Sequence, residues 1–147
     1  MSALYDRDFV LWTEEQAEAL RRAKGANLPL DWENLAEEIE SLGRSDQYEI
    51  DSRLEILLAH LLKWQFQPRE RSNSWKASIN EQRMRIARRI KASPSLKSYP
   101  TESVPGGYRI GRHVAIRETG LPESVFPEEC PYSIEQILDR NFFPGGL

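Results

Sequence analysis

The feature that most constrains the fold of this chain is a long stretch, Leu30 to Phe66, in which apolar residues recur every three or four positions. This spacing places side chains along one side of an α-helix. The apolar positions are Trp32, Leu35, Ile39, Leu42, Ile50, Leu54, Leu57, Leu61 and Trp64. We therefore expect a helix pair here that builds the core and ends before Pro68, with a bend rather than a loop at Gly43.

Two segments with the same spacing predict further helices before and after this stretch. The first runs from about residue 6 to residue 24, with Asp6 as its N-cap and Gly25 beyond its C-terminal end. The second begins near Ser72 and extends to about residue 93, with apolar residues on one side and many basic residues on the other. Both are amphipathic, so we expect them to pack on the central pair.

The last third of the chain is richer in proline and glycine, which favours shorter helices. We expect a fifth helix only from about Tyr108 to Thr119, because the Pro-Gly-Gly sequence at 105–107 disfavours a helix upstream. Ser133 and Gln136 then match the capping box that starts a short last helix. Strand-like alternation is absent from the sequence. The predicted fold class is therefore all-α, a helical bundle of about five main helices plus a short C-terminal helix.

Length and composition suit a single domain. The chain has 147 residues, of which 39% are hydrophobic, and we expect residues 1–147 to form one bundle with the proline-rich segment 120–147 docked on it. No apolar run approaches the roughly 18 residues that a membrane span needs, and the first residues lack the basic and apolar regions of a signal peptide. The sequence thus predicts a cytoplasmic protein without membrane association.

Charge is strongly segregated along the chain. Residues 1–62, 63–117 and 118–147 carry net charges of −8, +10 and −5, although the whole chain carries only −3. A basic block of this kind is typical either of a nucleic-acid-binding surface or of a surface that faces acidic groups within the fold or across a dimer. We favour the second interpretation because dedicated nucleic-acid binders have a strongly positive overall charge. The candidate nucleic-acid-binding residues are Arg83, Arg85, Arg88 and Arg89.

Candidate metal ligands and nucleophiles are few. Glu37 and Glu40 lie three residues apart and could share an ion, but dinuclear sites in bundles also use Glu-x-x-His pairs, which this sequence lacks. Cys130 is the single cysteine and is followed by Pro131, so we interpret it as a structural thiol. We therefore expect no metal and no cofactor.

Arg53 and His60 are the one pair that suggests a reaction. Seven residues are about two helical turns, so both side chains project from the same face, about 10 Å apart. The spacing resembles the variable-length Arg–His motif of a helical ribonuclease superfamily found in bacterial toxin and phage-defence systems. By that resemblance, His60 would act on the ribose 2′-hydroxyl or the leaving oxygen and Arg53 would stabilise the phosphorane, without a metal. The alternative, which we favour, is that His60 is a core residue bonded to a carbonyl or carboxylate, and that Arg53 pairs with Glu49 or another acid.

Four blocks of the sequence also resemble a known family. They are DFVLWTEEQAEALR at 8–21, DWENLAEEIESLGRSD at 31–46, RLEILLAHLLKWQFQPRERSNSW at 53–75 and ETGLPESVFPEECPYSIEQILD at 118–139. In this order, they closely resemble the bacterial family catalogued as domain of unknown function twenty-nine. The resemblance implies a helical bundle from a bacterium, but no activity and no catalytic residues. Between Ser98 and Gly111 the chain departs from the regular helix expected for the family.

The sequence therefore favours a non-enzymatic helical domain that binds a protein partner or forms a homo-oligomer. The alternatives are a metal-independent ribonuclease that uses Arg53 and His60, and an RNA-binding protein that uses the basic helix near residues 72–93. Exposure distinguishes these classes, because an interaction module presents apolar side chains at its surface whereas an enzyme presents a polar cleft.

Overall fold

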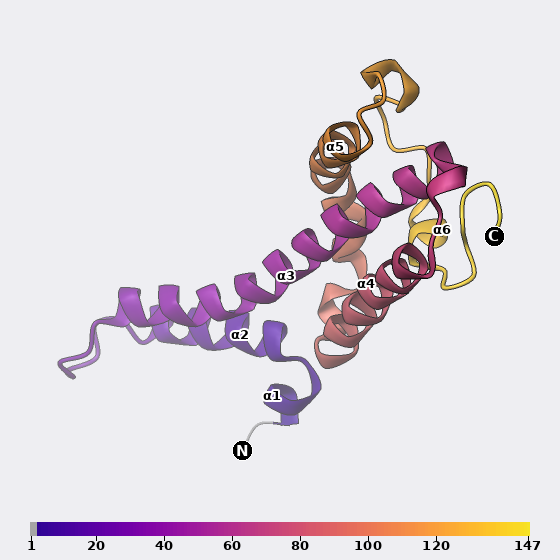
Figure 1. Cartoon of the computed structure of the whole chain (residues 1–147). Coiled ribbons are helices and arrows are strands. Elements are labelled where there is room, and N and C mark those ends of the chain that lie inside the picture. The colour runs from indigo at the N-terminus through magenta and orange to yellow at the C-terminus, as the bar shows by residue number, and fades with distance from the viewer. Residues whose placement is uncertain (1–2) are drawn as a thin grey trace. The chain divides into compact units, whose positions relative to one another are not determined.

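The protein is built from helices, as a computed structural model that describes residues 3–147 shows (Figure 1). Within these residues there is no strand, which confirms the all-α fold class. The helices are α1 (Ala3–Arg7), α2 (Phe9–Arg22), α3 (Trp32–Phe66), α4 (Asn73–Ala92), α5 (Tyr99–Thr119) and α6 (Ile134–Leu138). Short 3₁₀ turns lie at Pro68–Glu70, Pro94–Ser98 and Glu123–Val125. No helix in this part of the chain is long and apolar enough to cross a membrane.

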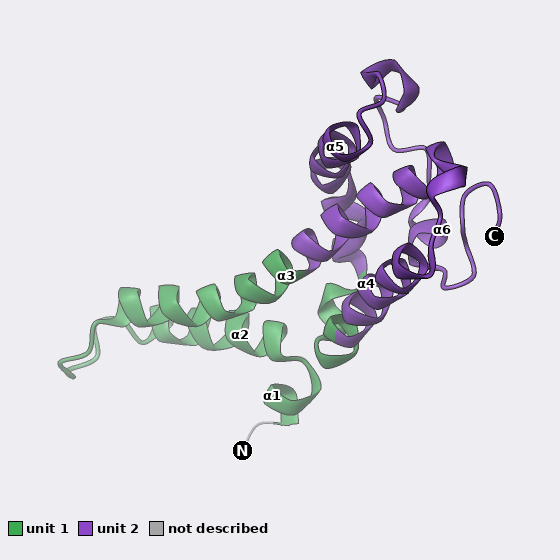
Figure 2. Ribbon diagram, in the orientation of Figure 1, with its two compact units in different colours: residues 1–49, 89–97 green, residues 50–88, 98–147 purple. Residues whose placement is uncertain are grey.

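The chain divides into two compact units (Figure 2). Unit 1 consists of residues 1–49 and 89–97, and unit 2 consists of residues 50–88 and 98–147. Helices α3 and α4 each contribute residues to both units. The single domain that the sequence suggests stays a prediction.

The first predicted helix is in fact two helices, α1 and α2. Asp8, with an extended backbone, separates them, and its carboxylate accepts a hydrogen bond from the Leu11 N–H at 3.0 Å. Asp8 is therefore the N-cap, and the choice of Asp6, which lies inside α1, was wrong. Both aspartates precede the same apolar pattern, so spacing alone does not distinguish them.

In unit 1, α2 runs beside the first part of α3 (Figure 1). They approach each other closely at Gly43, where a β-carbon would lie 2.5 Å from the Thr13 Oγ1 atom. α3 continues through Gly43 without a loop, as expected. Glycine is required here because the two helices leave no room for a side chain.

The first half of α3 turns a different side toward α2 than the apolar pattern predicts. Ala36 is fully buried and Gly43 is buried, whereas Leu35 and Leu42 are 40% and 52% exposed. Ala36 and Gly43 are seven residues apart and so share one face. The prediction of a core stripe through Leu35 and Leu42 was therefore wrong, because small residues permit the closer helix contact and the larger residues lie beside it.

The second half of α3 supplies the core of unit 2, as predicted. Its fully buried residues are Ile50, Leu54, Leu57, Leu58, Leu61 and Leu62. The second and third predicted helices thus form one continuous helix whose two halves bury different kinds of residue.

Helix α5 begins at Tyr99, nine residues before the predicted start at Tyr108, so that prediction was wrong. Pro105 lies inside the helix, and Gly107 and Gly111 are buried against α3. A β-carbon on Gly111 would lie 3.0 Å from the Glu55 carbonyl oxygen. Close packing of this glycine face on α3 therefore outweighs the low helix propensity of the Pro-Gly-Gly sequence.

The proline-rich C-terminal segment is held on unit 2 by hydrogen bonds. Tyr108 donates its hydroxyl to the Pro127 carbonyl at 2.5 Å, and the Trp64 indole N–H donates to the Gly146 carbonyl at 2.9 Å. The capping box predicted at the start of α6 is confirmed, since the Ser133 side chain accepts from the Gln136 N–H and the Gln136 side chain accepts from the Ser133 N–H.

Candidate functional sites

His60 and Arg53 both project from the second half of α3, within unit 2. The Nδ1 atom of His60 lies 2.9 Å from the Ile56 carbonyl oxygen, one turn earlier in the same helix, which fits an Nδ1–H group that donates to this carbonyl. Burial lowers the pKa of the imidazole below its ordinary value. Arg53 donates to the Gln82 side chain of α4 at 3.3 Å. Neither residue lines the three cavities described below.

Arg83, one of the candidate nucleic-acid-binding residues, is buried beneath the C-terminal segment of unit 2. Its side chain is buried, with 2% of the residue exposed, and donates to the Ile137, Gln136 and Phe142 carbonyl oxygens at 2.7, 3.3 and 2.9 Å. Burial lowers the pKa of the guanidinium to about 10, so the group stays charged at neutral pH. In the sequence, Arg83 looks the same as the exposed arginines of α4. The local pattern does not show that the C-terminal segment covers this one.

The other three candidate arginines of α4 are exposed. Arg85 pairs with Glu81 at 3.4 Å in unit 2, and Arg89 pairs with Asp46 at 3.2 Å in unit 1. Arg88 has no ion pair among residues 3–147. A shallow depression of about 500 Å³ follows this side of α4 in unit 2, lined by Ala77, Asn80, Glu81, Met84, Arg85 and Arg88.

A second cationic depression, of about 430 Å³, lies near the start of α4 in unit 2. Its lining residues are Trp64, Arg71, Ser72, Asn73, Lys76 and Leu147. The guanidinium of Arg71 lies over the Trp64 ring, 5.0 Å from its centroid, and donates to the Trp64 carbonyl. Because Arg71 covers the indole and Trp64 is only 4% exposed, this ring offers little surface for stacking a base.

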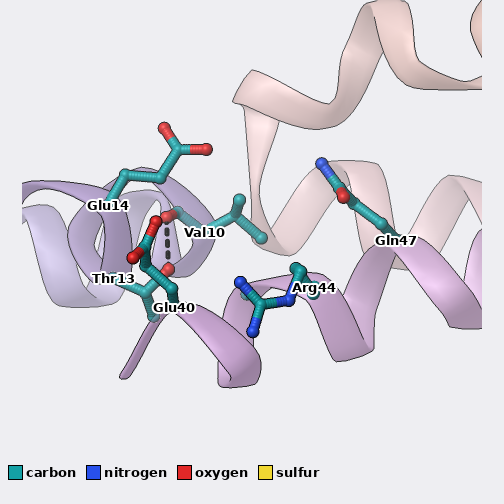
Figure 3. A pocket seen from close by; sticks show the side chains of 7 residues that line it. Val10, Thr13, Glu14, Glu40, Arg44 and Gln47 are labelled. Atoms are coloured by element: carbon teal, nitrogen blue, oxygen red, sulfur yellow. Dashed lines mark hydrogen bonds between the residues drawn. The ribbon is translucent and has the colours of Figure 1, made fainter. Parts of the chain in front are cut away.

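Unit 1 contains a smaller pocket of about 180 Å³ beside the contact between α2 and α3 (Figure 3). It is lined by Val10, Thr13, Glu14, Glu40, Gly43, Arg44 and Gln47. The Thr13 hydroxyl donates to the Val10 carbonyl at 2.6 Å, so it already has an acceptor within its own helix. The lining contains no histidine or cysteine that could act as a base or nucleophile.

Acidic side chains on this pocket side of α3 are neutralised by two arginines. Arg21 of α2 pairs with Glu33 at 3.1 Å and also with Glu40, and Arg44 pairs with Glu37 at 2.9 Å. The hydrogen bonds that Arg21 donates to Glu40 and Glu33 raise the pKa of its guanidinium. The Glu37 and Glu40 pair is thus engaged by cations. In the described residues, no group of three or more histidine, cysteine or acidic side chains could hold a metal ion.

The opposite side of the α2–α3 pair is apolar and open. Because Glu14 and Arg21 of α2 lie on the same side as Glu40 and Arg44 of α3, the remaining flanks of the two helices share the other side. We call this surface the open face and define it by Leu20, Trp32, Leu35, Ile39 and Leu42. Leu35 and Leu42 are exposed, and the other three residues are half-buried.

A repeat of small residues in the sequence indicates the contact side of α3, and the open face lies beside it. Ala36, Gly43 and Ile50 follow one another at intervals of seven residues along α3, and all three are buried. Such a repeat of mostly small residues marks the contact side of a helix better than the larger leucines do.

The helices and their packing define an all-α protein. A family model described as "Domain of unknown function DUF29" matches residues 4–143, and the chain belongs to this family. The structure is similar to the crystal structure, at 1.45 Å resolution, of an α-helical protein of unknown function from Rhodospirillum rubrum. The two chains share 22% sequence identity with a TM-score of 0.72, and the match covers 97% of this chain and 93% of the other. This likeness shows the fold. No curated protein matched the chain.

Proposed function

We propose that this protein is a non-enzymatic protein-interaction module and that the open face of unit 1 is its docking surface. The observation that supports the proposal is the exposure of Leu35 and Leu42, at 40% and 52%, on a helix whose neighbouring small residues are buried. Exposed apolar side chains that lie together on one face are typical of protein interaction sites. The loop before α3 has two further exposed apolar side chains, Leu28 and Leu30, which are 59% and 47% exposed.

The ribonuclease and RNA-binding alternatives have weaker support. A ribonuclease would have to use the Nε2 atom of His60, because the Nδ1 atom is engaged with the Ile56 carbonyl. Neither His60 nor Arg53 lines any of the three cavities described above. RNA binding would use Arg88 and its neighbours on α4, but Arg85 and Arg89 are each paired with an acid. The ribonuclease hypothesis would be favoured if the protein cut single-stranded RNA in the presence of a chelator and Arg53→Ala abolished the cutting.

The docking surface can be tested by photo-crosslinking in bacterial cells. A photoreactive phenylalanine analogue is placed at Leu35 or at Leu42, and at the exposed residues Met84 and Ile110 of unit 2 as controls. We expect the two α3 positions to give the same discrete crosslinked protein, identified by mass spectrometry, and the controls not to give it. Equal labelling at all four positions would contradict the proposal.

A further inference from the structure

The open face is bordered by acidic side chains that form no ion pair within the described part of the chain. On α3, Glu38 lies three residues after Leu35 and four before Leu42, so it flanks both leucines. On α2, Glu15 lies three residues after Trp12 and four before Ala19, on the outer side of the helix and away from the pocket residue Thr13. Both glutamates are exposed, and neither forms an ion pair with a cation in residues 3–147.

The distribution of ion pairs along α3 makes Glu38 distinctive. On the pocket side, Glu33, Glu37 and Glu40 are all within ion-pairing distance of Arg21 or Arg44. On the outer side of α2, Arg22 approaches Glu18 at 3.9 Å. On α3, the fold thus neutralises the acids of the pocket side and leaves Glu38, beside the open face, without an ion pair within residues 3–147. On α2, Glu14 of the pocket side and Glu15 both lack one.

From this arrangement we infer that the occupant of the open face is a basic amphipathic α-helix of another protein. The inference rests on the proposed function and adds the chemistry of the partner. A helix that lies along α2 and α3 would set its apolar stripe against Leu35, Ile39 and Leu42. Lysine or arginine residues on its two flanks would then approach Glu15 and Glu38.

A second copy of this chain fits the same surface less well. A two-fold symmetric contact places the same patch on both partners. The open faces of two copies would bring Glu15 and Glu38 of one copy toward the acidic border of the other, and like charges that meet at an interface oppose association. A basic partner removes this repulsion and supplies the missing cations.

The test uses the whole protein and a designed peptide probe. The probe is a fluorescently labelled helical peptide of about 18 residues, long enough to form a helix in water, with leucines on one side and lysines on both flanks. A peptide of identical composition in scrambled order controls for non-specific attraction. Binding is measured by fluorescence anisotropy at low and high salt, and the oligomeric state of the protein is measured by light scattering at the same concentration.

Two pairs of variants distinguish the contribution of the apolar side chains to binding from that of the acidic side chains. Leu35→Gln and Leu42→Gln should each weaken binding of the helical probe by roughly tenfold, as expected for loss of a buried apolar contact. Glu15→Lys and Glu38→Lys should each weaken it by roughly fivefold at low salt and less at high salt. Glu14→Lys makes the same charge change one residue away on the pocket side of α2, and should leave binding unchanged.

The outcomes distinguish the two proposals. If the leucine variants weaken binding but the lysine variants at Glu15 and Glu38 act no more strongly than Glu14→Lys, the basic partner is wrong while the docking surface stands. If the leucine variants bind like the parent protein, or the scrambled peptide binds equally well, the docking surface is wrong as well. If the protein instead forms a dimer that Leu35→Gln and Leu42→Gln dissociate, a second copy is the occupant and the inference is overturned.

Discussion

Thr13 of α2 and Gly43 of α3 are in direct contact, so that a β-carbon on Gly43 would lie 2.5 Å from the Thr13 Oγ1 atom. Because that oxygen donates its proton to the Val10 carbonyl, it is not the free end of a flexible side chain. The spacing of the two helices in unit 1, and with it the exposure of the leucines beside them, depends on this contact.

Gly43→Ala should lower the free energy of unfolding by about 1–3 kcal/mol, the usual cost of forcing atoms into a packed contact. Chemical denaturation followed by circular dichroism measures the change. Thr13→Ala in the same chain removes the obstructing oxygen and should recover a large part of the loss. Gly106→Ala is the matched control, because a β-carbon there would meet nothing within 4 Å, and it should raise stability by about 0.5–1 kcal/mol. If Gly43→Ala also stabilises the protein, the contact is looser than described.

Gly111→Ala should destabilise unit 2 for a related reason. The new methyl group would lie 3.0 Å from the Glu55 carbonyl oxygen and 3.1 Å from the Ala59 nitrogen, and backbone atoms cannot rotate away. We expect a loss of about 1–3 kcal/mol in thermal or chemical unfolding. Gly106→Ala again serves as the control in the same helix, and equal effects of the two substitutions would argue against the packing of α5 on α3.

Arg83→Ala should release the C-terminal segment from unit 2. The substitution removes hydrogen bonds to three carbonyl oxygens and leaves buried acceptors unpaired, at a cost on the order of 3 kcal/mol. Compared with the parent protein, the variant should show faster hydrogen exchange in residues 134–146, with a smaller increase in α3. Arg85→Ala, two residues away and exposed, loses only a surface ion pair and should cost under about 0.5 kcal/mol. Unchanged exchange in the Arg83 variant would show that other contacts hold the segment.

Acid should destabilise the protein in part through His60. Burial holds the pKa of the folded imidazole below its ordinary value of 6.5, so the unfolded state binds the proton more readily. The free energy of unfolding should then fall as the pH drops below about 6.5. His60→Asn keeps a donor near the position of Nδ1 but does not titrate there, and should show a shallower decline between about pH 7 and pH 5. Identical pH profiles for the two proteins would contradict this account.

Cys130 should react slowly with thiol reagents in the folded protein. The side chain is half-buried, its sulfur lies 3.5 Å from the Tyr132 carbonyl oxygen, and burial raises the pKa of the thiol. A smaller thiolate fraction near pH 8 gives a slower reaction with a disulfide reagent than free cysteine shows. Denaturation in urea should restore the rate, whereas a folded rate equal to that of free cysteine would show an accessible thiolate.

The sequence predicted the helices of unit 2 better than the packing of unit 1. Leu54, Leu57 and Leu61 recur at helical spacing and are buried, because a wide apolar arc leaves little doubt about which side faces inward. In the first half of α3 the spacing of the leucines is equally regular, but the side they occupy is not the one that meets α2. Regular spacing predicts a helix, whereas the choice of contact side depends on how closely Gly43 permits the helices to approach.

The same limit applies to the candidate sites. Arg53 and His60 share one side of a helix, as their separation requires, but their partners Gln82 and Ile56 follow from packing and rotamer. Arg83 shows this most clearly, since its three acceptors lie more than fifty residues later in the chain. Local pattern cannot predict such contacts, because it contains no information about which distant backbone atoms will meet a side chain.

The acceptors of Arg83 also have a consequence for the order of events during biosynthesis. α4 is synthesised well before the carbonyl groups of Gln136, Ile137 and Phe142, and proteins are made from the N-terminus at about 5–20 residues per second. Until those residues leave the ribosome, the guanidinium has none of its three final acceptors. Unit 2 therefore cannot reach its native packing on a nascent chain that lacks them, whereas unit 1 is complete once residue 97 has emerged.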